Sequence, residues 1–167
     1  MSGIVGIVHL DDAPVDCDLL RAMTRSLAFR GPDGQRVWSE DSVGFGHALL
    51  DTARASAPDL QPLTREGITV VADLRLDARS ELIAAFGTRG QDVSSAASDA
   101  ELLLRSYLAW GEECLDHLHG DFAFALWDSR RRHLFCARDP FGVKPFFYAH
   151  NGSCFLFSNT LECLRLH

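Results

Sequence analysis

The sequence of 167 residues is short of positive charge, because 16 Lys and Arg residues stand against 23 Asp and Glu residues and leave a formal net charge of −7. Binding a nucleic-acid backbone needs clustered positive charge, so this balance argues against a nucleic-acid partner. No apolar run approaches the about 20 residues needed to cross a bilayer. The first residues also lack the basic segment of a secretory signal. We therefore expect neither nucleic-acid nor membrane partners.

Paired cysteines are also missing, because the five cysteines form no Cys-x-x-Cys pair and are odd in number. This pattern disfavours the disulfide framework of a secreted protein and favours a reduced, cytoplasmic compartment. His117 and His119 lie near Cys114 in the sequence, but residues two apart do not share a helix face and no third ligand is evident. We expect no metal site.

The hydrophobic pattern predicts one α+β domain rich in antiparallel strands. The length suits a single domain with a substantial core, and no repeat or linker interrupts it. Helices are predicted over 18–27, 80–86, from the capping residue Ser98 through Trp110, and from a cap at Ser158 through Leu166. Strands are predicted over 3–9, 37–38, 43–47, 68–72, 122–127, 134–137, 146–149 and 154–157, with a surface loop over 51–62. The continuous apolar runs indicate sheets that are covered on both faces.

The N-terminus combines a predicted strand at residue 3 with a small hydroxyl residue directly before it. Removal of Met1 would make Ser2 the first residue. A free α-amine, with a pKa of about 8, can act as general base for the hydroxyl of its own residue. By position alone, Ser2 could equally be an ordinary small residue after the start codon.

Six short motifs follow one another in a specific order. They are Ser2-Gly3-Ile4-Val5-Gly6-Ile7, Arg30-Gly31-Pro32-Asp33-Gly34, Gly46-His47, Ser98-Asp99-Ala100-Glu101, residues 118–128 (LHGDFAFALWD) and residues 138–145 (RDPFGVKP). As an ordered set they resemble the class II glutamine amidotransferase domain of the asparagine synthetase family, over nearly the whole chain. The resemblance implies a four-layer αββα sandwich of two antiparallel sheets, as in N-terminal-nucleophile hydrolases.

The resemblance also implies a glutaminase site, which this sequence has largely lost. In the family an N-terminal cysteine attacks the glutamine amide, and an arginine, an Asn-Gly pair and an aspartate hold the substrate. Ser2 stands at the nucleophile position, and a hydroxyl is a weaker nucleophile than a thiolate. Leu49 replaces the arginine and removes a charge-assisted clamp. Ala72 and Asp73 replace the Asn-Gly pair, and losing one oxyanion donor costs on the order of 10²–10³ in rate. Only Asp99 is retained. The helix dipole favours an acidic residue in the first turn of a helix, and this would explain Asp99 equally well.

These departures predict a catalytically degenerate domain of an ATP-dependent amide-forming enzyme. The segment 72–79 (ADLRLDAR) is similar to the corresponding stretch of lasso-peptide cyclases and of other degenerate relatives such as β-lactam synthetase. In such relatives an amine of the substrate replaces ammonia, and a second domain uses ATP and magnesium. No Ser-Gly-Gly-x-Asp phosphate loop of that domain occurs here. We expect residues 1–167 to form one amidotransferase-like domain without a cofactor, with the synthetase domain absent from this chain.

A lasso-peptide macrolactam cyclase is the most specific interpretation, and two alternatives stay open. The chain could be an active glutaminase domain that uses Ser2 and supplies ammonia to an asparagine synthetase, or a stand-alone, non-catalytic peptide- or partner-binding module. The expected partners are a synthetase domain in cis or in trans and a precursor peptide or its processing enzyme. Asp73, Arg75, Asp77 and Arg79 could form a solvated ion-pair network, and we expect them to decorate a strand edge and a helix entry rather than to bind a ligand. Lys144 is expected to serve structure or a domain contact.

Overall fold

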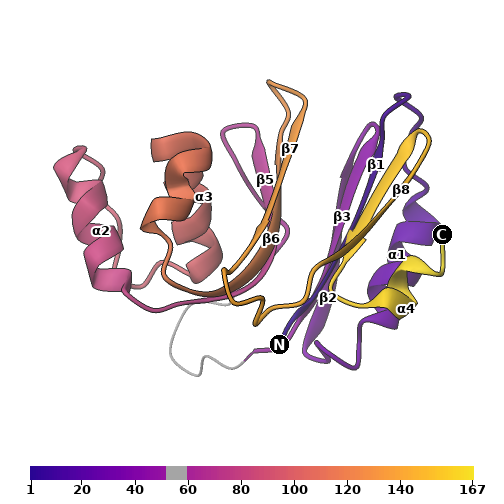
Figure 1. Ribbon diagram of the computed structural model, residues 1–167, viewed down its shortest axis with the longest axis horizontal. Helices are drawn as coiled ribbons and strands as arrows, with labels where there is room; N and C mark the ends of the chain where they lie inside the picture. Colours follow the sequence, from indigo (N-terminus) through magenta and orange to yellow (C-terminus); the bar gives the residue numbers. More distant parts are fainter. Residues whose placement is uncertain (52–59) are drawn as a thin grey trace.

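Two antiparallel sheets pack face to face in the computed structural model, which describes residues 1–51 and 60–167. Sheet A has the strand order β2-β3-β1-β9-β8, and sheet B has the order β4-β5-β6-β7. Figure 1 shows α1 and α4 on the outer face of sheet A, and α2 and α3 on the outer face of sheet B. The predicted four-layer αββα sandwich is therefore confirmed.

The chain starts in sheet A, continues through sheet B and returns to sheet A. Sheet A contains β1 (Gly3–His9), β2 (Gly34–Glu40), β3 (Val43–Leu49), β8 (Phe147–Asn151) and β9 (Cys154–Ser158). Sheet B contains β4 (Leu63–Arg65), β5 (Ile68–Leu76), β6 (Gly120–Asp128) and β7 (His133–Arg138). The helices are α1 (Cys17–Ser26), α2 (Arg79–Thr88), α3 (Asp99–Trp110), the 3-10 helix η1 (Gly111–His117) and α4 (Leu161–Leu164).

The core has three apolar layers, one between the sheets and one under each pair of helices. The layer between the sheets includes Ile4, Val8, Phe45, Val71, Ala123, Ala125 and Phe157. Because the inner strands are covered on both faces, they read as continuous apolar runs in the sequence. Gly6 is required for close packing, since a Cβ there would lie 2.1 Å from the ring of Phe157.

Several element boundaries differ from the predictions. The strand predicted over 68–72 continues to Leu76, and the sequence pattern missed β4 and η1. Ser98 caps α3 as predicted, with its side chain accepting a hydrogen bond from Glu101 N at 3.2 Å. The predicted cap at Ser158 is wrong, because Ser158 ends β9 and its hydroxyl donates to Ile4 O at 2.8 Å. Thr160 caps the final helix instead. Residues 52–59 of the predicted surface loop lie outside the described residues.

Candidate functional site

The candidate site lies at the start of β1, where Ser2 leads into the centre of sheet A. The Ser2 hydroxyl accepts a hydrogen bond from Leu50 N at 3.2 Å. The Ser2 carbonyl accepts from Asn159 Nδ2 at 2.8 Å and from Arg30 Nε at 3.3 Å. Asn159 also accepts from Ile4 N through its Oδ1 at 3.1 Å. The backbone around Ser2 is therefore held from several sides.

Asp73 reaches Ser2 from β5, on the opposite sheet. Its Oδ1 accepts a hydrogen bond from Ser2 N at 3.1 Å and another from Lys144 Nζ at 3.2 Å. Its Oδ2 lies 3.6 Å from Arg30 Nη2. Asp73 is 3% exposed, so the prediction of a solvated charge is wrong at this position. The physical reason is that β5 continues through residue 73, which places the carboxylate between the sheets beside two cations.

Lys144 is presented to Asp73 by a tight loop built on Asp139. The Asp139 carboxylate accepts hydrogen bonds from the backbone N–H groups of Phe141, Val143 and Lys144 at 2.9–3.1 Å. Desolvation opposes ionisation, but these hydrogen bonds outweigh it and lower the pKa of Asp139. The motif 138–145 therefore fixes a lysine against the carboxylate that contacts Ser2.

Both carboxylate oxygens of Asp99 contact other residues of this chain. Its Oδ2 accepts a hydrogen bond from Leu76 N at 2.8 Å, and its Oδ1 forms an ion pair with Arg79. Arg79 also donates to Ala97 O at 2.5 Å. These contacts join the start of α3 to the end of β5 and the start of α2. Arg75 and Asp77 form an exposed ion pair as expected, whereas Arg79 pairs with Asp99, outside the predicted network, and is partly buried.

Leu49 and Ala72 complete the predicted set but occupy different surroundings. Leu49 ends β3 and is partly buried, next to Leu50, whose N–H contacts Ser2. Ala72 packs in the apolar layer between sheet B and its helices. Neighbouring strand residues point to opposite faces, so Asp73 faces Ser2 while Ala72 faces away. The structure therefore brings Ser2 and Asp73 together and leaves Ala72 and Asp99 outside this contact set.

Three residues of the site were not predicted as site residues. Arg30 and Lys144 lie in two of the recognised motifs, so the motifs could have suggested them. Asn159 follows the last strand and carries no sequence signal.

Among residues 1–51 and 60–167, no group of His, Cys, Asp and Glu side chains is arranged to hold a metal ion. No helix in the same ranges is long and apolar enough to cross a membrane.

Comparisons with known proteins match this chain to amidotransferases. The family described as glutamine amidotransferase domain matches residues 1–167. Asparagine synthetase [glutamine-hydrolyzing] 3 of Bacillus subtilis is 39% identical over 171 residues, which cover 100% of this chain and 28% of that protein. A putative asparagine synthetase [glutamine-hydrolyzing] of Mycobacterium tuberculosis is 35% identical over 172 residues, which cover 90% of this chain and 25% of that protein. The chain thus spans about a quarter of the length of these relatives.

Solved structures share the fold at low sequence identity. Glutamine phosphoribosylpyrophosphate amidotransferase from B. subtilis, solved with ADP and GMP, has a TM-score of 0.79 and 17% identity to this chain. The match covers 98% of this chain and 43% of that one. At this identity the similarity establishes the sandwich fold and nothing about the chemistry of the site.

Proposed function

The chain belongs to the glutamine amidotransferase domain family, as a class II domain of the asparagine synthetase type, and we propose that it is a catalytically degenerate member. In this proposal it serves as the non-catalytic domain of an ATP-dependent amide-forming enzyme. The observation that carries the proposal is the buried carboxylate of Asp73, 3.1 Å from Ser2 N.

Asp73 works against the chemistry that an N-terminal nucleophile needs. After removal of Met1, the nitrogen of Ser2 would be an α-amine that must accept the proton of its own hydroxyl. A carboxylate in hydrogen-bond contact with that nitrogen stabilises the protonated amine, which is not a base. Lys144 and Arg30 pair with the carboxylate and hold it in place. The site is therefore arranged to neutralise charge rather than to activate the hydroxyl.

The groups expected to hold glutamine are also poorly suited to it. Leu49 offers no charge to a substrate carboxylate. The retained Asp99 already pairs with Arg79, so a substrate ammonium would have to displace a guanidinium that this chain supplies itself. Both features support the loss of glutamine binding independently of Ser2.

The finer proposal concerns the enzyme to which the domain contributes. The segment 72–79 supports a lasso-peptide macrolactam cyclase, in which a substrate amine makes released ammonia unnecessary. ATP and magnesium would bind the synthetase domain, present in cis or in trans, and not residues 1–167. A precursor peptide or its processing enzyme would be a further partner. The names of the relatives, glutamine-hydrolysing asparagine synthetases, support the amide-forming class.

The first test measures glutamate release from glutamine by the purified chain, with the state of Met1 determined by mass spectrometry. We expect no release above that of the Ser2→Ala variant. Release that disappears in Ser2→Ala would instead establish the active glutaminase with Ser2 as nucleophile. Amide formation from a linear precursor, ATP and magnesium by the complete enzyme would test the cyclase assignment separately.

The second test restores two of the missing groups, the cysteine and the arginine, in two variants that differ only at residue 73. Ser2→Cys/Leu49→Arg keeps Asp73, and Ser2→Cys/Leu49→Arg/Asp73→Gly removes it. If the Asp73 carboxylate suppresses glutaminase activity, glutamate release should rise by at least about tenfold in the second variant. Loss of one oxyanion-hole donor, for comparison, costs on the order of 10²–10³ in rate. Circular dichroism would establish that both variants are folded. Equal release from the two variants would contradict the role given to Asp73.

A further inference from the structure

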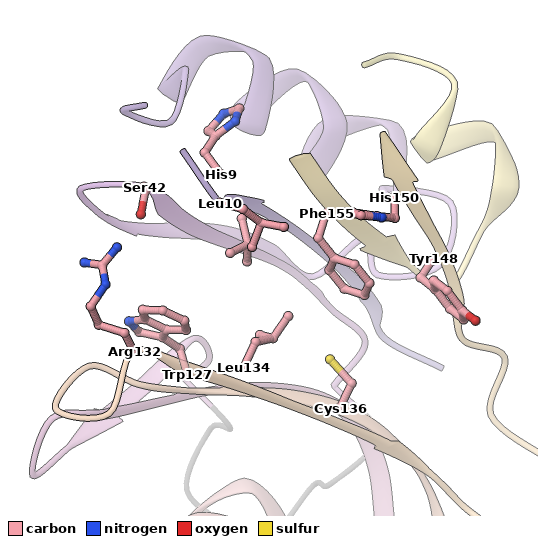
Figure 2. Close-up of a pocket in the computed structure, with 11 residues that line it drawn as sticks. His9, Leu10, Ser42, Trp127, Arg132, Leu134, Cys136, Tyr148, His150 and Phe155 are labelled. Atoms are coloured by element: carbon pink, nitrogen blue, oxygen red, sulfur yellow. The ribbon is translucent and has the colours of Figure 1, made fainter. Parts of the chain in front are cut away.

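The strand β2 forms a free edge of sheet A and is the longest edge strand of the two sheets. The sheets end at β2, β8, β4 and β7, and β2 has seven residues, whereas the others have five, three and six. Among residues 1–51 and 60–167, no strand pairs with β2 on the side away from β3. The other edge strand of sheet A, β8, carries Tyr148 and His150 beside the cavity shown in Figure 2. A long row of backbone groups is therefore open to pairing at the opposite edge of sheet A, along β2.

The side chains of β2 place two charges symmetrically about Trp38. The Trp38 ring lies 5.6 Å from the ring of Phe45, centroid to centroid, and packs against the layer between the sheets. Arg36 and Glu40 lie two residues to either side of Trp38, and side chains two apart in a strand share a face. Both residues are exposed, and among the described residues neither side chain forms a hydrogen bond or an ion pair. A cation and an anion thus flank Trp38, and both are open to a partner.

The charges on β2 are self-complementary under a two-fold rotation. When two antiparallel copies of this strand pair about an axis at Trp38, Arg36 of each copy faces Glu40 of the other, which gives two ion pairs. Centring the pair on Val37 would set Arg36 against Trp38, and centring it on Ser39 would set Glu40 against Trp38. Opposite charges directly across a strand pair stabilise it, and like charges destabilise it. Of these three registers, the one centred on Trp38 is therefore the most favourable.

We propose that two copies of this chain associate through β2, antiparallel about a two-fold axis at Trp38, and so join their A sheets into one continuous sheet. The charges identify a second copy as the partner. An unrelated apolar strand at this edge would leave Arg36 and Glu40 without counter-charges, whereas the symmetry mate supplies both. The two Trp38 side chains meet at the axis, where facing Cβ atoms lie about 4.5–5.5 Å apart. This association is independent of the proposed loss of glutaminase activity.

A basic groove beside β2 receives a further charge in the same register. The groove has a volume of about 260 Å³, and its lining includes Arg21 and Arg25 of α1 and Gln35 of β2. Arg21 pairs with Asp18 at an exposed position, and the Arg25 side chain has no ion pair within the described ranges. In the register centred on Trp38, Asp41 of the second copy faces Gln35 and thus lies beside the groove. The groove and the strand edge therefore favour the same pairing.

Sedimentation equilibrium of the purified chain over a concentration series tests the proposal. We expect a reversible monomer–dimer equilibrium for the native chain. Arg36→Glu and Glu40→Arg each convert both ion pairs into like-charge contacts, so each variant should dimerise at least about tenfold more weakly. Circular dichroism establishes that both variants are folded. The control Arg165→Glu, at an exposed position after α4, makes the same change of net charge as Arg36→Glu and should dimerise like the native chain.

Mixing the two variants separates this register from other contacts. In an equal mixture of Arg36→Glu and Glu40→Arg, each strand carries charges of one sign, so a mixed pair again has two opposite-charge contacts. The mixture should associate about as strongly as the native chain, although neither variant does so alone. A native chain that stays monomeric at every concentration would overturn the proposal. Dimers of native affinity in both single variants, or a mixture that stays monomeric, would overturn it as well. Glutamate release is measured separately, so failure of the degenerate-site proposal and failure of this one give different results.

Discussion

Asp73 is the residue on which both the proposed loss of glutaminase activity and the contact between the two sheets depend. The resemblance places glycine at this position, and the aspartate found here extends from sheet B to Ser2 on sheet A. Because Lys144 and Arg30 surround it, the carboxylate is buried without being unpaired. The ion cluster that opposes glutaminase chemistry in our proposal therefore also joins the two sheets beside the N-terminus.

This double role predicts a loss of stability when the charge is removed. Asp73→Asn keeps the shape of the side chain but leaves Lys144 buried without a counter-charge, which should lower the free energy of unfolding by about 3–5 kcal/mol. Urea unfolding measures the change. Adding Lys144→Met to Asp73→Asn should recover most of the loss. Arg75→Ala, which breaks an exposed pair with Asp77, should cost less than about 1 kcal/mol. Similar losses in Asp73→Asn and in Arg75→Ala would show that the buried ion pair contributes no more to stability than the exposed one.

At the scale of elements, the sequence predicted the core strands well and their ends poorly. Runs such as residues 122–127 are apolar on both faces, and that pattern is independent of the partner strand. The β-branched, strand-like pattern covers only residues 68–72 of β5, yet pairing with β6 continues from Ala72–Phe124 to Leu76–Gly120. Tertiary pairing thus overrides local composition. For the same reason, the local pattern does not indicate that Arg30 and Asn159 contact Ser2, since these contacts cross 28 and 157 positions.

The position of β3 predicts a pH dependence of stability. β3 lies between β1 and β2, and His47 shares its inner face with Phe45, 2% exposed. Burial lowers the pKa of His47 to about 4 from 6.5. Between these values the unfolded chain binds a proton that the folded chain does not, so stability falls as the pH falls from about 6.5 to 4. At about 1.4 kcal/mol per unit, the total loss is about 3 kcal/mol.

Urea unfolding of the native chain and of His47→Gln at several values between pH 7 and pH 4 would measure this effect. Other titrating groups are common to both proteins, so the difference in unfolding free energy isolates His47. The variant should lose relative stability at pH 7 and regain it toward pH 4. A difference that does not change with pH would mean that His47 is accessible to protons in the folded state.

At the scale of the whole molecule, the two ends of the sandwich differ in the contacts between the sheets. Ion pairs and hydrogen bonds close the end that carries Ser2, whereas the opposite end has a cavity of about 690 Å³ between the sheets, with Val8, Leu134 and Cys136 among the residues that line it. In our proposal the glutaminase chemistry at the Ser2 end is lost, and the ion cluster there serves to hold the two sheets together.

The open end predicts that one substitution will have opposite effects at two cysteines. Cys136→Met adds apolar atoms to the cavity wall, where space is free, and should raise the free energy of unfolding of the isolated chain by about 1 kcal/mol. Cys163→Met enlarges a fully buried residue whose thiol donates to Met23 O at 3.5 Å, and should lower it by about 1–3 kcal/mol through overpacking. Thermal and urea unfolding of both variants provide the comparison. A loss of stability in Cys136→Met as large as that in Cys163→Met would mean that the sheets close over the cavity in solution.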